Sequence, residues 1–252
     1  MIKVVLLGAG NLGTHLFRAL RDAENISLVQ WYNRSSPPLE EGKNHLQTTT
    51  DLHQIVEADV YLLSVSDSVL PRLSQVLEER NGLVAHTAGS VPMAILQKNK
   101  NHGVFYPLQT FSKQKQVDFH QIPICLEANT ASNLTLLRTI ANALGAPVHL
   151  IDSSQREALH LAAVFVNNFT NHLYSIGHSI CQEKEVPFSI LQPLIKETAD
   201  KILALAPKAA QTGPALRNDI TIVNQHMEQL TTENQKKLYQ SLTNSIQLYH
   251  GH

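Results

Sequence analysis

Cysteine is scarce in this chain of 252 residues, which contains only Cys125 and Cys181. Two distant cysteines cannot build a disulfide framework, and their separation does not match the paired spacing of cysteine metal sites. We therefore expect no bound metal. This cysteine usage is typical of a reducing compartment, so we also expect a cytoplasmic location.

The chain also lacks a charge excess of either sign and any long apolar run. Its formal net charge is -1, which argues against nucleic acid or an anionic membrane as the main partner. No uninterrupted apolar run approaches the length of a membrane-spanning helix, and the N-terminus does not have the pattern of a signal peptide. The composition therefore predicts a soluble intracellular protein with one large or two modest domains.

The first thirteen residues, MIKVVLLGAGNLG, are the most informative part of the sequence. The apolar run Ile2–Leu7 predicts a buried strand, which a glycine-rich turn joins to a helix-forming stretch that begins at Thr14. Strand, glycine turn and helix in this order are typical of the first βα unit of a dinucleotide-binding domain. A tight turn without a ligand is the other interpretation.

The glycines of this turn have separate expected roles. Gly8 permits the tight turn, Gly10 lets the backbone approach a pyrophosphate, and Gly13 lets the helix lie against the strand. Free N–H groups at the start of the helix would then face the anion.

The pattern of predicted elements changes near residue 152. Strand and helix patterns alternate before it, which predicts a mostly parallel sheet with helices on both faces. After it, only helical patterns occur, with one helical stretch expected over Arg156–Glu183 and a short helix over Pro214–Asn218. We predict a Rossmann-type α/β domain over residues 1–152 and an all-helical domain over residues 153–252.

The end of the second predicted strand, Ile26–Tyr32, indicates which dinucleotide binds. NAD-binding domains place a carboxylate there for the ribose hydroxyls, whereas this chain has Asn33, Arg34 and Ser35. The Arg34 guanidinium can bind a 2′-phosphate bidentately, and Ser35 can donate a hydrogen bond to it. These residues favour NADP over NAD and argue against a methyltransferase. An ordinary polar turn is the alternative interpretation.

Small and polar residues follow three further predicted strands. Ligands of open α/β sheets bind outside the carboxyl ends of the strands, so we expect the nicotinamide and its reaction partner there. Each loop alone is compatible with ordinary turn chemistry. Ser64, Val65 and Ser66 are expected beside the cofactor, and the expected substrate-binding residues are Thr87, Ala88, Gly89, Ser90 and Tyr106.

Polar residues recur along the apolar helical stretch that follows Ser154. At about 3.6 residues per turn, His160, Asn167, Asn171 and His178 fall close to one face, with Asn168 offset from it. Such a stripe is an exposed face, an internally paired network or the wall of a cleft. We predict a cleft wall, with His160 as general acid/base, Asn167 or Asn168 orienting the reacting group, and Asn171 binding substrate.

Six segments in chain order carry a family resemblance: VVLLGAGNLGTHL, LLSVSDSVL, HTAGSV, FYPLQTF, HLAAVFVNNF and TGPALRND. Together they resemble a family of Rossmann-like proteins described as candidate NADP oxidoreductases. That family is related to deazaflavin-dependent NADP reductases, and more distantly to 6-phosphogluconate, β-hydroxyacid and prephenate dehydrogenases and to pyrroline-5-carboxylate reductases. The resemblance implies a helical domain that dimerises, an active site between the domains, and roles for Asn11 and Leu12 in the pyrophosphate loop.

The chain departs from some of these relatives at its predicted catalytic helix. In β-hydroxyacid dehydrogenases the equivalent helix carries a lysine with an asparagine one turn later, whereas this chain has His160 and Val164. It is more similar to prephenate dehydrogenases, in which a histidine begins the helix. Tyr106 stands where related enzymes often have a histidine before the proline. These differences argue against a lysine-assisted oxidation of a hydroxyacid.

The sequence thus predicts an NADP-dependent oxidoreductase. It would transfer a hydride between nicotinamide and a small carbonyl, hydroxyl or imine compound held between the domains of a homodimer. The alternative is a non-catalytic NADP(H)-binding sensor or scaffold dimer, because no cluster of acids, lysines or metal ligands in the helical part requires catalysis.

Overall fold

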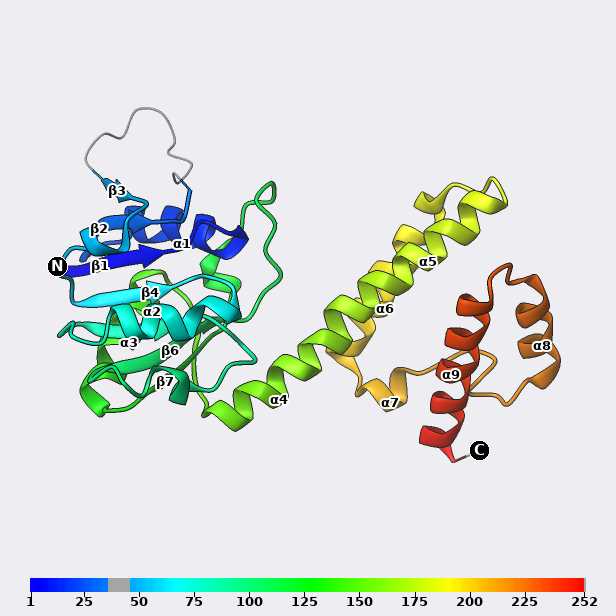
Figure 1. Ribbon diagram of the computed structural model, residues 1–252. Helices are drawn as coiled ribbons and strands as arrows, with labels where there is room; N and C mark the ends of the chain where they lie inside the picture. Colours follow the sequence, from blue (N-terminus) through cyan, green and yellow to red (C-terminus); the bar gives the residue numbers. More distant parts are fainter. Residues whose placement is uncertain (36–45, 252) are drawn as a thin grey trace. The chain divides into compact units, whose positions relative to one another are not determined.

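The computed structural model describes residues 1–35 and 46–251. The chain divides into two compact units, Met1–Asn167 and Asn168–His252, which are described here separately (Figure 1). The sheet lies wholly in the first unit, and every regular element after it is helical. The first unit also includes the helix α4 (Ser153–Ala163), which the prediction assigns to the helical domain.

Eight strands form one sheet in the described part of the first unit, in the order β3-β2-β1-β4-β5-β6-β7-β8. Neighbouring strands are parallel except for the antiparallel pair β6 and β7. The predicted Rossmann-type, mostly parallel sheet is therefore confirmed. The strands are β1 (Ile2–Leu7), β2 (Ile26–Tyr32), β3 (Gln47–Thr49), β4 (Val60–Leu63), β5 (Leu83–His86), β6 (His102–Pro107), β7 (Ile124–Ala128) and β8 (Val148–Leu150).

Helices cover both faces of this sheet because its central strands are apolar on both sides. Val4 and Leu6 of β1 belong to the core that contains side chains of α1 (Asn11–Asp22) and α3 (Ala131–Ala143). Val5 and Leu7 point to the opposite face, into the core that contains side chains of α2 (Leu70–Val76). Short 3-10 turns complete this unit: η1 (Leu52–Gln54), η2 (Asp67–Val69), η3 (Met93–Leu96) and η4 (Phe119–Gln121).

The strand order reverses direction between β1 and β4. Strands β2 and β3 lie on one side of β1, whereas β4, β5 and β6 follow on the other side. The loops that leave β1 and β4 therefore diverge, and this is the place where open α/β sheets bind their ligands. The glycine turn follows β1 directly at this point.

The helical stretch predicted over Arg156–Glu183 contains an irregular segment. It begins as α4, continues as the π-helix η5 (Val164–Phe169), and ends as α5 (Thr170–Glu183). A π-helix has i→i+5 hydrogen bonds, so each residue turns through a smaller angle than in an α-helix. The single polar face predicted from a uniform 3.6-residue turn is therefore interrupted at the position of Asn167 and Asn168.

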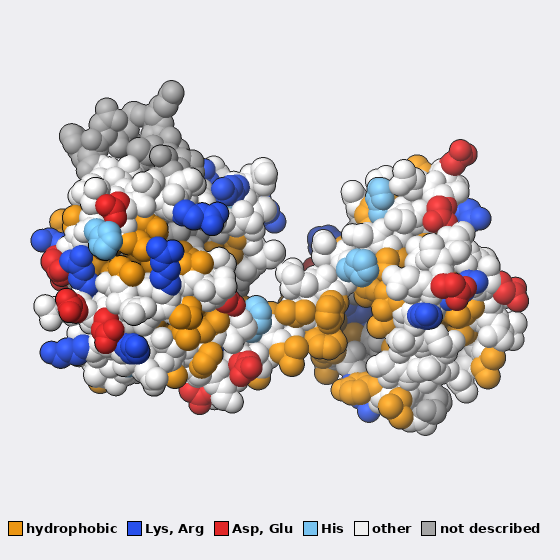
Figure 2. All heavy atoms as spheres, in the orientation of Figure 1, with side chains coloured by type: hydrophobic (Ala, Val, Ile, Leu, Met, Phe, Trp, Pro, Cys, Tyr) orange, Lys and Arg blue, Asp and Glu red, His pale blue; other side chains and the backbone are white. Residues whose placement is uncertain are grey.

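The second unit is helical throughout its regular elements but encloses little apolar surface. After α5 come η6 (Phe188–Leu191), α6 (Gln192–Ala204), α7 (Pro207–Ala210), α8 (Ile220–Gln229) and α9 (Glu233–His250). Ala215 and Val223 are the buried hydrophobic residues among those described after residue 167. Many larger apolar side chains are exposed instead, and Figure 2 shows such side chains in orange on the surface of the helical part.

The short helix predicted over Pro214–Asn218 is wrong. These residues form turns, in which the Asp219 N–H donates to the Pro214 carbonyl at 2.9 Å. Gly213 and Asn218 both have positive φ, at 107° and 52°, which a right-handed helix does not allow.

Among the helices within residues 1–35 and 46–251, none combines the length and the hydrophobicity that crossing a membrane requires.

Replacing Gly8 with alanine should destabilise the sheet unit by about 3 kcal/mol or more. Gly8 has a φ of 113°, and an added Cβ would lie 1.9 Å from the Ser64 carbonyl oxygen. Trp31 is the only tryptophan, and its indole N–H donates to the Gly8 carbonyl, so its fluorescence during urea unfolding reports on this region.

Gly10→Ala is the matched control in the same turn. Gly10 has a φ of -70°, and a Cβ there would meet nothing within 4 Å, so this variant should keep nearly the wild-type free energy of unfolding. Equal losses in the two variants would contradict the packing argument.

Candidate functional site: a dinucleotide pocket beside a tyrosine–histidine pair

Three segments meet at the glycine turn with no room for side chains between them. A Cβ at Gly13 would lie 2.4 Å from the Gly8 carbonyl oxygen, and the Gly8 backbone in turn lies against the Ser64 carbonyl. The helix α1 can therefore approach β1 and β4 closely only with glycine at both positions. Gly10 differs, because its Cβ position faces open space. The turn thus leaves backbone accessible at the start of α1, where an anion would bind.

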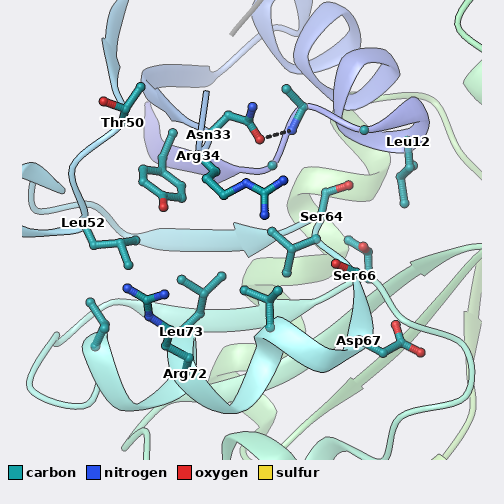
Figure 3. A pocket seen from close by; sticks show the side chains of 18 of the residues that line it. Leu12, Asn33, Arg34, Thr50, Leu52, Ser64, Ser66, Asp67, Arg72 and Leu73 are labelled. Carbon is teal, nitrogen blue, oxygen red and sulfur yellow. Dashed lines mark hydrogen bonds between the residues drawn. The ribbon is translucent and has the colours of Figure 1, made fainter. Parts of the chain in front are cut away.

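This open space belongs to a cavity of about 950 Å³ at the carboxyl ends of β1, β2 and β4 (Figure 3). Gly10 is the N-cap of α1 and makes no side-chain capping bond, so the first turn of the helix has no side-chain acceptor there. The cavity is lined by Gly8, Ala9, Gly10, Asn11, Leu12, Tyr32, Asn33, Arg34, Thr50, Asp51, Leu52, His53, Ser64, Val65, Ser66, Asp67, Val69, Arg72, Leu73, Val76, Thr87 and Ala88.

Most of the predicted cofactor-binding residues line this cavity, and two do not. Gly13 lies behind the turn, where its role is packing, and Ser35 lies outside the lining. Thr87 and Ala88, which the sequence analysis assigns to substrate, line the same cavity. The structure thus places the end of β5 beside the dinucleotide pocket.

Asn33 connects the glycine turn to the end of β2. Its side-chain oxygen accepts from the Ala9 N–H at 3.3 Å, and its amide nitrogen donates to the Ser35 carbonyl at 2.9 Å. The Asn33 side chain thus bonds to two backbone groups of the protein itself. It therefore shapes the turn from which Arg34 extends. Arg34 is exposed, and Figure 3 shows its guanidinium extending into the cavity.

Sequence reasoning missed the opposite wall of the cavity. Leu52 comes from η1, and Arg72 and Leu73 come from α2. The helix α2 follows Ser66, Asp67 and Ser68, residue types that are typical of a helix start. Which of its faces lines the pocket depends on how α2 packs against the sheet, and the sequence alone does not carry this signal.

The loop after β5 joins the cavity to a second group of polar residues. His86, at the end of β5, accepts a hydrogen bond from the Ala88 N–H at 3.2 Å. Gly89 comes next, and a Cβ there would lie 2.5 Å from His160 Nδ1 and 2.8 Å from the Tyr106 hydroxyl. Ala88 lines the cavity, and Gly89, the next residue, lies against both Tyr106 and His160. The cavity and this pair of side chains are therefore neighbours.

Tyr106 and His160 form a hydrogen-bonded pair although they come from β6 and α4. The Tyr106 hydroxyl lies 3.1 Å from His160 Nδ1, and the rings meet edge to face. Burial raises the pKa of the Tyr106 hydroxyl, Cys125 adds to this, and the charge of Arg156 opposes it. The phenol therefore stays protonated at neutral pH and can donate to the imidazole. Ser90, also predicted to bind substrate, donates instead to Asp67 at 2.9 Å.

A buried ion pair fixes α4, and with it His160, on the sheet. Arg156 is 1% exposed and binds Glu127 of β7, while its second terminal nitrogen donates to the Val91 carbonyl at 2.8 Å. Ser153, at the start of the same helix, donates to Glu127 at 2.8 Å. His160 lies four residues after Arg156, one turn further along the helix. These bonds hold the imidazole beside Tyr106.

The predicted amide partners of His160 lie elsewhere. Asn167 and Asn168 are exposed residues of η5, and Asn171 is an exposed residue of α5. Within the described residues, no hydrogen bond joins any of these amides to the Tyr106–His160 pair. Their assignment to substrate stays a prediction.

The described residues, which omit 36–45 and 252, contain no group of three or more histidine, cysteine or acidic side chains placed to hold a metal ion.

The sheet order, the glycine turn and the cavity at the strand ends define a Rossmann-type dinucleotide-binding protein. A Bacteroides fragilis protein described as a candidate NADP oxidoreductase is 40% identical, with 98% of each chain covered and a TM-score of 0.87. The chain belongs to the same family as this protein. Residues 122–246 also match a family model described as a domain of unknown function, DUF2520.

More distant solved structures share the fold. A Thermotoga maritima protein covers 98% of both chains at 20% identity, with a TM-score of 0.73. A Plasmodium falciparum pyrroline carboxylate reductase with NADP bound covers 98% of both chains at 13% identity, with a TM-score of 0.56. Two prephenate dehydrogenase structures also share the fold, at 14% and 18% identity. The predicted family resemblance is confirmed by the Bacteroides fragilis protein. None of the curated proteins matches the chain.

The stability of the sheet unit should fall between pH 7.5 and pH 5 because of His86. Burial, followed by the nearby charge of Arg156, lowers the pKa of His86 from 6.5 to about 4, and the Pro92 carbonyl opposes this only weakly. As the pH falls, His86 is therefore protonated in the unfolded chain at a higher pH than in the folded protein. This difference lowers the free energy of unfolding by about 2 kcal/mol between pH 7.5 and pH 5.

The variant His86→Asn keeps an acceptor for the Ala88 N–H but does not titrate. Urea unfolding followed by Trp31 fluorescence at the two pH values should show a smaller pH-dependent loss than in the wild type. The same loss in both proteins would mean that His86 is not buried in its neutral form.

Proposed function

We propose that this protein is an NADP-dependent oxidoreductase. The observation that carries the proposal is the continuity between the dinucleotide cavity and the Tyr106–His160 pair through residues 87–89. The 40% identical Bacteroides fragilis protein, described as a candidate NADP oxidoreductase, supports the choice of cofactor. The reaction is a hydride transfer between nicotinamide and a small carbonyl, hydroxyl or imine compound.

The cavity fits NADP at both ends of the nucleotide. Gly10 leaves the backbone open to a pyrophosphate, and the N–H groups of the first turn of α1 face it. Asn33 and Arg34 stand where a carboxylate would select NAD, so the ribose end accepts a 2′-phosphate. Ser64 and Thr87 line the cavity as well, and the chain runs from Thr87 through Ala88 to Gly89, which lies against the Tyr106–His160 pair. The nicotinamide would be held on this side.

When bound, NADPH would supply the hydride for the carbon of the substrate's double bond. His160 donates a proton to the oxygen or nitrogen of that bond, which leaves an alcohol or amine and NADP⁺. The acid form of His160 is the imidazolium, whose Nε2–H reaches the substrate while Nδ1–H donates to the Tyr106 hydroxyl oxygen 3.1 Å away. The transfer leaves a neutral imidazole. Gly89 leaves the space that both rings need.

Asn167 or Asn168 would orient the reacting group, and Asn171 would contact the substrate. Their side chains are exposed and make no hydrogen bond to Tyr106 or His160 within the described residues, so the proposal for them rests on the sequence pattern alone. The expected location of the substrate between two domains likewise stays a prediction, and so does the cytoplasmic location.

Wild-type protein should bind NADPH with micromolar or tighter affinity and oxidise it with at least one compound of a panel of keto acids, imines and aldehydes. His160→Ala should lower kcat about 100-fold or more, because general acid catalysis is lost, with little change in the Kd for NADPH. Gly10→Ala should instead weaken NADPH binding, because a Cβ enters the pyrophosphate site. Fluorescence titration and initial rates measure both effects.

Two outcomes would contradict this proposal. NADPH binding without turnover across the whole panel would favour the sensor or scaffold. Unchanged turnover in His160→Ala would remove the histidine from the chemistry and leave it a structural partner of Tyr106.

We also propose that the helical unit forms a homodimer. Exposed apolar side chains recur along its helices: Phe169 is 51% exposed, Leu194 60%, Leu203 87% and Leu248 80%. A unit with so little buried apolar surface gains stability when a second copy covers such side chains. Light scattering at micromolar concentration should give twice the mass of the chain, and a monomer would contradict the proposal.

A further inference from the structure

Arg72 is a second guanidinium on the wall of the dinucleotide cavity. It comes from α2, across the cavity from Arg34, and Figure 3 shows it reaching up on the side where Leu52 lies. Both arginine side chains are exposed. Neither makes a hydrogen bond or an ion pair with any residue in the ranges 1–35 and 46–251. Two cations thus line one cavity without a partner from the described protein.

The acidic residues of the cavity do not neutralise this pair. Asp51 accepts from the His53 backbone N–H at 2.9 Å and caps η1. Asp67 accepts from the Ser90 hydroxyl at 2.9 Å. Within the described residues neither carboxylate forms an ion pair with Arg34 or Arg72, so an anion bound between the two arginines would be attracted by both.

The position of the two arginines indicates which anion this is. The pyrophosphate would bind at Gly10 and the start of α1, and its charge is met there by backbone N–H groups. Arg34 follows β2 and Arg72 lies near Leu52, so both belong to the ribose end of the cavity. A phosphate monoester carries about 1.5 to 2 negative charges at pH 7 and three acceptor oxygens. One guanidinium bonds two of these oxygens and supplies a single charge.

We propose that Arg72 is a second ligand of the 2′-phosphate, and that together with Arg34 it determines the preference for NADP over NAD. This inference rests on the proposed NADP-dependent function. The same side chain could instead stack on the adenine beside Leu73. That role would serve NADH and NADPH equally, so the two roles are separable by experiment.

The test compares ligands that differ only by the 2′-phosphate, NADPH with NADH and 2′,5′-ADP with 5′-AMP, by fluorescence or calorimetric titration. Arg72→Gln should raise the Kd of the 2′-phosphorylated ligands about tenfold or more and change the others less than about twofold. Arg72→Lys should retain part of the preference, because the charge remains. Arg138→Gln is the matched control, since Arg138 is exposed on α3 and does not line the cavity.

Three results would overturn the inference. Equal weakening of both ligands in Arg72→Gln would assign the side chain to the adenine. An unchanged preference in Arg72→Gln, together with a lost preference in Arg34→Gln, would leave Arg34 as the only determinant and the proposed function intact. A wild-type protein that binds NADH as tightly as NADPH would remove the NADP proposal itself, and Arg72 with it.

Discussion

The close contact between Gly8 and the Ser64 carbonyl oxygen is the constraint on which the site depends. It allows α1 to begin directly after β1 and to lie against β4 without a side chain in between. The indole N–H of Trp31, a residue of β2, donates a hydrogen bond to the Gly8 carbonyl. The strands on both sides of β1 therefore contact this turn. As a consequence of this packing, the backbone at Gly10 is accessible from the cavity.

From this turn outward, each part of the cavity has a different chemical character. The glycine turn offers backbone N–H groups, the ends of β2 and α2 offer guanidiniums, and the loop after β5 leads to the Tyr106–His160 pair. That pair depends on a second fixed point, the buried Arg156–Glu127 ion pair that holds α4 to β7. The groups proposed to bind the anion and those proposed to transfer the proton are thus held by separate interactions within one unit.

Local sequence patterns were sufficient for most of the sheet and for the glycine turn. Ile26–Tyr32 begins and ends where its apolar run predicts, because hydrophobicity and β-branched residues mark buried strands directly. The edge strand Gln47–Thr49 was missed because it is short and polar. The contact between Tyr106 and His160 joins residues 54 positions apart, and Arg72 enters the cavity only through packing of α2. Such contacts arise from the tertiary fold and leave no local pattern.

A crystal structure of the protein with NADPH tests the central claim most directly, because it shows which side chains surround the nicotinamide ring. The account predicts the ring beside Ser64 and Thr87, with the His160 imidazole facing the carbon that gives up the hydride and still bonded to Tyr106. An ordered NADPH molecule with His160 far from the ring and directed to solvent would contradict it.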